Sequence, residues 1–325
     1  MVVSNLCRLL VLAVGCLPML CSAQPEAEPK LPALMKIVVP FSAGASNDAI
    51  ARAVSPLLAK RLGTTVIVEN RPGAAGVIGA DYVAKSPGDG SVLLLTSSTF
   101  LTAAATQPKL PYDLVTAFSP VALIGDGPML LAVSAQTPVK TIGEFIAAAK
   151  AKPGALTYGT SGTGSIAHLA TEMLADAAHF KMTHIPYKGA SNALLDMAGG
   201  QIDMMISNYT SIAPQIKSGK VRALAITSAQ GNPVFSELPP VSSVVPGYSA
   251  DIWVALFAPA SMPPALVARL NRELVQIAKS PEVKALLEPD GATPMALTPE
   301  EVSRRIKSDL ALWKKIAMEK KIVIE

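Results

Sequence analysis

Short runs of valine, isoleucine and leucine alternate with amphipathic segments along most of the sequence. In the first block the apolar runs are 37–40, 66–70 and 91–98, and helix-type segments at 48–62 and 76–86 separate them. Continuous apolar strands separated by helices are typical of βαβ units, in which helices cover both faces of a parallel sheet. This pattern predicts an α/β fold.

The same alternation begins again in the second half of the chain, without a tandem sequence repeat. The expected strands there are 156–161, 182–189, 202–208 and 221–228, and the expected helices are 141–154, 165–178, 190–200 and 210–219. An apolar strand at 252–258 and two helices, 264–279 and 299–320, complete the chain.

Two α/β blocks of similar length predict two lobes with a ligand cleft between them. The chain is expected to pass between the lobes near 123–133 and again near 248–258. The expected division is a signal peptide at 1–23, a flexible leader at 24–34, a first lobe at 35–125 to which most of 249–325 returns, and a second lobe at 126–248.

The N-terminus has the features of a secretory signal peptide. A basic residue, Arg8, precedes an apolar run from Leu9 to Leu20, and small residues follow up to Ala23. The run is too short to span a membrane. We therefore expect cleavage after Ala23 and a periplasmic protein. Lipidation at Cys16 or Cys21 is the alternative, although the flanking residues fit an acceptor site poorly.

Cysteine content and charge exclude several classes of protein. All three cysteines, Cys7, Cys16 and Cys21, belong to the expected signal peptide. The secreted chain would therefore contain no disulfide, thiolate metal site or cysteine nucleophile. The net charge of +4 is mild, and no basic stripe with interleaved aromatic residues is present, so nucleic acid is not an expected partner.

The segment 158–170, YGTSGTGSIAHLA, passes from Gly, Thr and Ser directly into a helix-forming run. Unpaired backbone N–H groups and the helix dipole at such a start attract anions, and the hydroxyls add donors. A single such segment is more often only a loop and a helix cap. However, residues 37–51 repeat the arrangement, with Ser46, Asn47 or Asp48 as cap. Two such turns facing one cavity would form an anion site.

Catalysis is difficult to assign. The histidines are His168, expected to pack or bond locally, His179, expected at a solvated helix end, and His184, expected in the core. The GTSGT segment lacks the final glycine of a nucleophile elbow, and no P-loop lysine or zinc-ligand spacing occurs. We expect no enzyme activity, cofactor or metal. A secreted hydrolase using Ser161 or Ser165 is a weaker alternative, because it lacks a convincing base.

Several other polar residues follow expected strands. Arg71 could bind a carboxylate with two hydrogen bonds. Because it follows a strand and precedes a proline, a structural pair that holds this turn is the preferred interpretation. Lys188 suits the cleft and the surface equally well. Tyr187 could contact the ligand or pack inside the lobe. For Asn208 and Tyr209, a place in the cleft wall and a place outside it are equally compatible with the sequence.

The ordered segments resemble a known family. KIVVPFSAGASNDAIA, ENRPGA, YGTSGTGSIAHLATEML, HIPYKGASNALLDMAGGQIDMMISN and IKSGKVRALAITS are similar to the substrate-binding proteins of tripartite tricarboxylate transporters, also called Bug receptors. The resemblance covers nearly the whole secreted chain. It implies a type II periplasmic binding protein that closes on a small organic acid and delivers it to membrane permease subunits, and we expect a monomer. Signalling to a membrane histidine kinase is an alternative.

The resemblance also implies ligand contacts, held in relatives by backbone N–H groups, hydroxyls and ordered water. By position they are Phe41, Ser42, Ala43, Gly44, Ser46, Asn47, Ser97, Ser98 and Thr99 in the first lobe, and Thr160, Ser161, Gly162, Thr163, Gly164, Ser165, Tyr187, Lys188, Gly189, Ala190 and Asn208 in the second. None is acidic, so we expect a di- or tricarboxylate or an aromatic carboxylate rather than an amino acid. The first loop departs from the common Pro-Gly-Gly pattern of relatives, because it reads Ala43, Gly44, Ala45.

Overall fold

The computed structural model describes residues 31–324, so the expected signal peptide and most of the expected leader lie outside the described residues. The strands are β1 (Leu34–Val39), β2 (Thr65–Asn70), β3 (Val92–Ser97), β4 (Phe118–Gly127), β5 (Leu130–Ser134), β6 (Thr157–Thr160), β7 (Thr183–Pro186), β8 (Met204–Ser207), β9 (Val221–Ile226), β10 (Ile252–Pro259) and β11 (Thr293–Pro294). The helices are α1 (Ser46–Leu62), α2 (Val77–Ala84), α3 (Thr99–Thr106), α4 (Ile142–Ala151), α5 (Ile166–Ala177), α6 (Ala190–Ala198), α7 (Tyr209–Lys217), α8 (Pro264–Ala278), α9 (Pro281–Leu287) and α10 (Pro299–Glu319).

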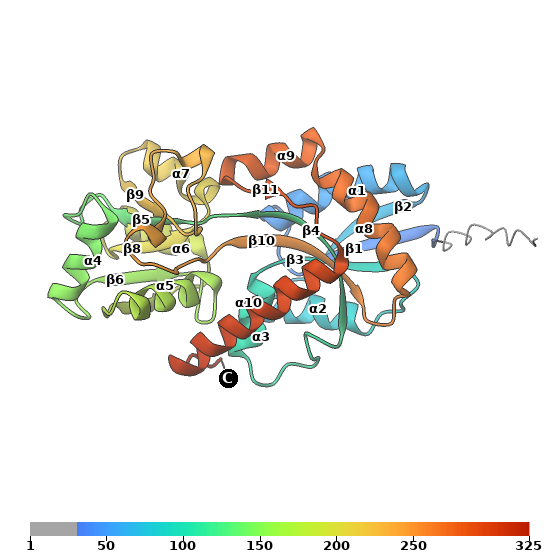
Figure 1. Cartoon of the computed structure of the whole chain (residues 1–325), viewed down its shortest axis with the longest axis horizontal. Helices are drawn as coiled ribbons and strands as arrows, with labels where there is room; N and C mark the ends of the chain where they lie inside the picture. Colours follow the sequence, from blue (N-terminus) through green and yellow to red (C-terminus); the bar gives the residue numbers. More distant parts are fainter. Residues whose placement is uncertain (1–30, 325) are drawn as a thin grey trace, which may run out of the picture. The chain divides into compact units, whose positions relative to one another are not determined.

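The strands form two sheets, each the centre of one α/β lobe (Figure 1). The first-lobe sheet has the order β11-β4-β10-β3-β1-β2, and the second-lobe sheet has the order β7-β6-β8-β5-β9. The chain enters the second lobe between β4 and β5 and returns to the first lobe with β10. Both crossing segments are visible in Figure 1 as long connections between the sheets.

Both sheets are mixed, which corrects the expectation of a parallel sheet by adding antiparallel strands to a parallel set. β1, β2 and β3 are parallel, but β10 is antiparallel to β3 and to β4. In the second lobe β6, β7 and β8 are parallel, whereas β5 is antiparallel to β8 and β9. The antiparallel strands β5 and β10 are the first strands after each crossing, because a chain that enters a lobe at the cleft runs away from it.

This strand direction places several segments at the cleft. Val254 of β10 pairs with Ser97 at the carboxyl end of β3, and Leu130 of β5 pairs with Ser207 at the carboxyl end of β8. The loops that follow the parallel strands and the segments that cross between lobes therefore meet at the same sheet edges. Ligands in α/β sheets bind beyond these carboxyl ends.

Helices cover both faces of the first-lobe sheet. Met35, Ile37 and Val39 point to one face of β1 and pack with α1, α8 and α9, whereas Val38 points to the other face, with α2, α3 and α10. This alternation follows from the two-residue period of a strand. The hydrophobic core around Val38 continues into the second lobe, where α4 and α5 pack on one face of the sheet. Helices α6 and α7 cover the opposite face of that sheet.

Most helix boundaries agree with the sequence-based prediction. α1 ends at Leu62, and the following residue, Gly63, adopts the left-handed conformation typical of a helix stop. Thr141 and Ser165 cap α4 and α5 by accepting backbone N–H bonds, and Thr298 forms a capping box with Glu301. Two short helices, α3 and α9, were not predicted.

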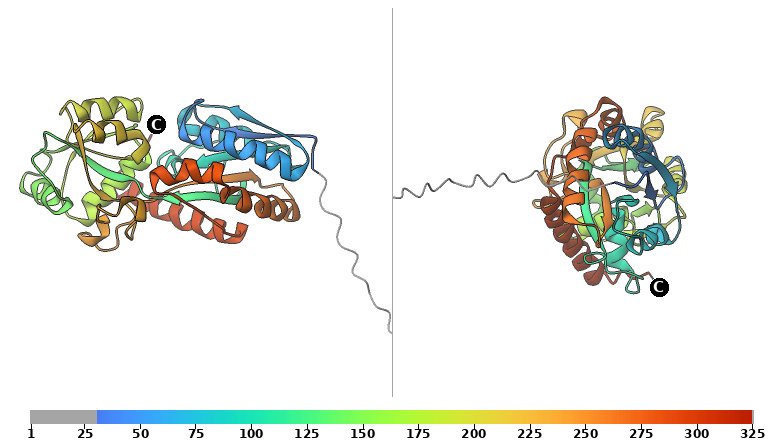
Figure 2. Two further views of the ribbon diagram at one scale, coloured as in Figure 1. Left: turned by 90° about the horizontal axis from the view of Figure 1, so that it is seen from above. Right: turned by 90° about the vertical axis from the view of Figure 1, so that its right-hand side faces the viewer.

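The two C-terminal helices have different positions. α8 packs with α1 on the first lobe. α10 runs from the first lobe toward α5 of the second lobe (Figures 1 and 2). Lys320, just beyond the end of α10, forms an ion pair with Asp176 at 2.6 Å. The last described helix thus contacts both lobes.

Candidate ligand-binding site

A cavity of about 340 Å³ lies at the facing strand ends of the two lobes. Six of the ligand contacts expected from the sequence line this cavity: Phe41, Ser46, Asn47, Ser97, Ala190 and Asn208. The remaining lining residues are Ala45, Ile50, Gly125, Pro128, Ile252, Val254, Leu286, Leu287, Asp290 and Ala292. The cavity thus combines loop residues after β1 and β3 with the start of α6, the end of β8 and the crossing segments.

The other expected contacts lie in the same loops or beside them, but do not line this cavity. Ser42, Ala43 and Gly44 belong to the loop between β1 and α1, and Ser98 and Thr99 begin α3. Thr160, Ser161, Gly162, Thr163, Gly164 and Ser165 connect β6 to α5, and Tyr187, Lys188 and Gly189 connect β7 to α6. Because β6 lies between β7 and β8 in parallel register, these loops share the sheet edge of Asn208.

Asp48 organises the loop between β1 and α1. Its Oδ2 accepts hydrogen bonds from Gly44 N at 2.9 Å and Arg52 Nε at 3.0 Å, and its Oδ1 accepts one from Asn70 Nδ2 at 2.9 Å. Asn70 Nδ2 also donates to Phe41 O at 3.1 Å. The Arg52 bond, with the other donors, lowers the pKa of Asp48 to about 2. The loop is therefore held from behind by an ionised carboxylate.

Two histidines organise the loop between β6 and α5. His168 Nδ1 accepts a hydrogen bond from Gly164 N at 3.1 Å, and His184 Nε2 lies 2.7 Å from Thr160 Oγ1. The two rings stack with centroids 3.9 Å apart. Burial lowers the pKa of each ring to about 4, so both are neutral at pH 7. His168 bonds locally, as predicted. His184 is half-buried and supports the loop, rather than lying fully in the core.

The serine residues proposed for hydrolysis have different surroundings. Ser165 caps α5, since its Oγ accepts a hydrogen bond from His168 N at 3.3 Å. Ser161 is exposed. The imidazole nitrogens with assigned bonds face Gly164 and Thr160 rather than either serine. Among residues 31–324 this arrangement pairs neither serine with a histidine base.

The loop between β7 and α6 is tied to its own helix. Tyr187 Oη donates to Asp196 Oδ2 at 2.7 Å, and burial together with this bond raises the Tyr187 pKa to about 12. Lys188 is exposed, and Gly189 has a φ of 135° before the first residue of α6. Tyr209, at the start of α7, packs against Phe235 rather than lining the cavity.

Asp290 is a cavity residue that sequence reasoning missed. It lies at the end of the 3₁₀ turn η4 (Glu288–Asp290), directly after α9. Its Oδ1 accepts a hydrogen bond from Thr210 N at 2.7 Å, and its Oδ2 accepts one from Thr210 Oγ1 at 3.0 Å. The turn-type sequence EPDG was visible, but its partner is 80 residues away and no local pattern connects the two.

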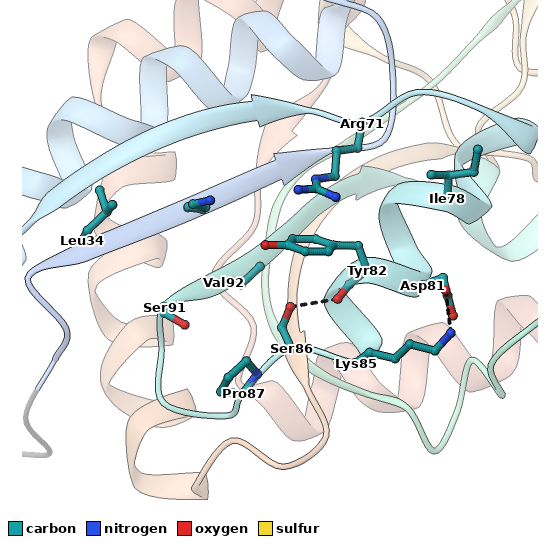
Figure 3. A pocket seen from close by; sticks show the side chains of 11 residues that line it. Leu34, Arg71, Ile78, Asp81, Tyr82, Lys85, Ser86, Pro87, Ser91 and Val92 are labelled. Atoms are coloured by element: carbon teal, nitrogen blue, oxygen red, sulfur yellow. Dashed lines mark hydrogen bonds and ion pairs between the residues drawn. The ribbon is translucent and has the colours of Figure 1, made fainter.

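A second hollow, of about 670 Å³, lies on the first lobe (Figure 3). Arg71 lies over the Tyr82 ring at 3.5 Å and donates to Glu69 Oε1 at 2.5 Å, which confirms that it forms a structural pair. The walls of this hollow include Leu34 and Val92, at the amino ends of β1 and β3. It therefore lies away from the strand ends where the two lobes meet.

The described residues contain no group of three or more His, Cys, Asp or Glu side chains that could hold a metal ion. Within 31–324, no helix has both the length and the apolar character needed to cross a bilayer.

Two α/β lobes joined by crossing strands, with a cavity at the facing strand ends, define a two-lobed binding protein of type II. The sequence pattern of the tripartite tricarboxylate transporter family receptor matches residues 50–322. The chain belongs to this family, whose members are periplasmic solute receptors rather than enzymes.

Individual relatives agree with this assignment. Protein BugT of Bordetella pertussis is 34% identical over 288 residues, which are 88% of this chain and 88% of BugT. The structure of R. palustris Rpa4515 with adipate has a TM-score of 0.79 and 32% identity, covering 89% of this chain and 98% of that one. MatC from Rhodopseudomonas palustris, with bound malate, has a TM-score of 0.75 and 29% identity, covering 87% and 98%.

Proposed function

We propose that this protein captures a small organic carboxylate between its two lobes and delivers it to a tripartite tricarboxylate-type permease. The observation that carries the proposal is the cavity at the facing strand ends, where hydroxyl and amide groups such as Ser46, Asn47 and Asn208 meet apolar walls. Two structural neighbours in the same family hold carboxylates, adipate and malate. The protein acts by binding and release rather than by catalysis.

In this proposal the ligand docks first on the loop between β1 and α1, and hinge closure then brings the second-lobe loops onto it. The residues we assign to first-lobe contact are 41–47 and 97–99, and those of the second lobe are 160–165, 187–190 and 208. A hydrogen bond to a charged group contributes about 1.5 to 3 kcal/mol, while micromolar affinity requires about 8 kcal/mol. A few such bonds from each lobe are sufficient.

We also propose how the chain is processed and divided into lobes. The signal peptide is cleaved after Ala23, and 24–34 forms a flexible leader in the periplasm. Residues 35–125 with 249–325 form the first lobe, and 126–248 form the second. The working unit is a monomer.

Thermal unfolding of the secreted chain, residues 24–325, tests the binding step. The panel contains mono-, di- and tricarboxylates, aromatic acids, amino acids and nicotinate. A ligand that binds only the native state stabilises it by about 2.7 kcal/mol at a hundredfold excess over Kd. We expect one class of acid to raise the Tm. The increase should be lost in Asn47→Ala, whereas Ser218→Ala, an exposed position at the far end of α7, should retain it.

The contrary result is no shift with any acid, in protein that mass spectrometry shows to carry no retained ligand. Delivery is tested separately by uptake of the identified acid in cells with and without the receptor gene. Uptake that continues unchanged without the receptor would contradict a transport role and leave binding intact.

A further inference from the structure

The walls of the cavity combine many apolar side chains with a few neutral polar groups and one acidic residue. Large apolar side chains in its lining include Phe41, Ile252, Val254, Leu286 and Leu287, and hydroxyl or amide groups supply the neutral donors. The lining contains no Lys, Arg or His, and Asp290 is its single charged residue. A pocket of this kind holds an apolar body and orients it by a few polar groups.

Asp290 reaches from the first lobe to the N-terminus of α7 in the second. Only 8% of the residue is exposed, and both carboxylate oxygens accept bonds from Thr210. The Nδ2 of Asn208, the residue before α7, lies 3.5 Å from Asp290 Oδ2. Figure 1 shows α9, which precedes Asp290, close to α7.

A helix N-terminus favours an anion, because its first N–H groups lack intrahelical partners and the helix dipole is positive there. Here the protein supplies that anion itself. The N–H and hydroxyl of Thr210 are bonded to Asp290, so they are already occupied when a ligand arrives.

We propose that Asp290 fills the anion position at the start of α7 and thereby makes the cleft selective for acids with one carboxylate and an apolar body. This inference rests on the proposed function. A second carboxylate in the same cavity would lie near Asp290 without a Lys, Arg or His to offset the repulsion. Like charges in a partly buried site disfavour each other, which builds specificity by rejection. A hydrocarbon end, in contrast, gains free energy by contact with Leu286, Leu287 and Val254.

Matched pairs of acids test the inference by titration calorimetry. The pairs are hexanoate with adipate, butyrate with succinate, and benzoate with terephthalate, since the members of each pair differ by one carboxylate. We expect the monocarboxylate of any pair that binds to be at least about tenfold tighter. Asp290→Asn retains an acceptor for Thr210 and removes the charge, so the preference should fall by about tenfold or more.

The matched control is Glu288→Gln, which removes the same charge from an exposed position two residues earlier in η4. It should leave the preference unchanged. The inference is overturned if the wild-type protein binds the dicarboxylate of a pair as tightly as the monocarboxylate, a result that does not depend on the folding of any variant. It is also overturned if folded Asp290→Asn keeps the full preference. If no acid of the wider panel binds, the proposed function itself fails, and the inference fails with it.

Discussion

Asp48 of α1 accepts a hydrogen bond from Asn70 at the end of β2, 22 residues later, with Oδ1 and Nδ2 2.9 Å apart. The same Asn70 amide donates to Phe41 O, and the other Asp48 oxygen accepts from Gly44 N. The buried Asp48 carboxylate thus holds Gly44 directly, and it holds Phe41 through Asn70, in the loop that we assign to ligand contact. The network connects three elements at the first-lobe edge of the cleft.

Replacing Asp48 by alanine should destabilise the protein and weaken ligand binding. The change leaves Gly44 N and one Asn70 donor bond without their acceptor, and such a loss costs about 1 to 3 kcal/mol. Urea unfolding at pH 7 measures this cost, and Glu237→Ala, at an exposed site, is the control.

The cost of Asp48→Ala should also depend on pH. Because the folded pKa of Asp48 is lowered to about 2, the stability that its carboxylate contributes is present above the unfolded pKa of 3.8 and is lost as pH falls through 2. A deficit that stays equal at pH 7 and pH 2 would contradict this account.

The stacked rings of His168 and His184 should remain neutral well below the usual histidine pKa. Burial lowers both pKa values from 6.5 to about 4, and the nearby Glu172 carboxylate only partly opposes this for His184. NMR titration of the ring protons should therefore show no protonation at pH 5.5. The two neutral rings contribute to the free energy of unfolding, and this contribution is complete above pH 6.5 and is lost as pH falls toward 4. His179→Gln, at an exposed position, should leave this pH dependence unchanged, and a ring that titrates near 6.5 would refute the prediction.

Asp251 lies in the segment where the chain returns to the first lobe, and its pKa is shifted upward, whereas that of Asp48 is shifted downward. Burial, reinforced by the neighbouring Asp126 carboxylate, raises the pKa of Asp251 to about 7, although Arg305 opposes the shift. Arg305 is bonded instead to Asp126 at 3.0 Å and Asp309 at 2.9 Å. No hydrogen-bond partner of Asp251 Oδ1 lies among the described residues. The ionised form of Asp251 is therefore poorly supported.

Asp251→Asn should change the pH dependence of stability with a defined sign. The folded protein holds the Asp251 proton more tightly than the unfolded chain, whose pKa is 3.8, so stability falls as pH rises from 3.8 to 7. The variant removes this loss, so it should gain roughly 4 kcal/mol relative to the wild type between pH 4 and pH 8, at about 1.4 kcal/mol for each unit of the pKa shift. Urea unfolding at both values measures the difference. Equal pH dependence of the two proteins would show that Asp251 ionises as an ordinary aspartate.

The sequence predicted the elements whose signals are local. Apolar runs marked β1, β3 and β8, and Gly63 and Ser165 marked helix ends, because strand periodicity and capping depend on neighbouring residues. The antiparallel direction of β10 was not predictable from its apolar composition, since a buried strand looks the same in either direction. α3 was missed because it is one short Ala- and Thr-rich segment that directly follows the strand end at Ser97.

The residues that line the cavity were predictable only where they lie at or just after the end of a strand. Phe41, Ser46 and Ser97 follow or end β1 and β3, so their position at the sheet edge could be inferred. Leu286 and Asp290 come from a distant helix and turn that reach the cavity only through packing. For the same reason the His168 and His184 stack was invisible, because it depends on the alignment of α5 with β7.

Alanine at Gly164 should be much more costly than alanine at Gly154, although both glycines have positive φ, +75° and +81°. At Gly154 an added Cβ meets nothing within 4 Å, so only the left-handed backbone is penalised, by about 1 kcal/mol. At Gly164 the same Cβ would lie 2.6 Å from Thr106 Oγ1 at the end of α3 and 2.5 Å from Ile324 Cδ1. Both neighbours belong to segments outside the second-lobe sheet, so the substitution would push the loop between β6 and α5 away from the first lobe.

We expect Gly164→Ala to lower the free energy of unfolding by about 2 to 4 kcal/mol, which is the sum of the backbone penalty and the cost of overpacking, and to weaken ligand binding. Gly154→Ala should bind normally, and equal unfolding midpoints for the two variants in urea would show that the contact with α3 does not constrain this loop.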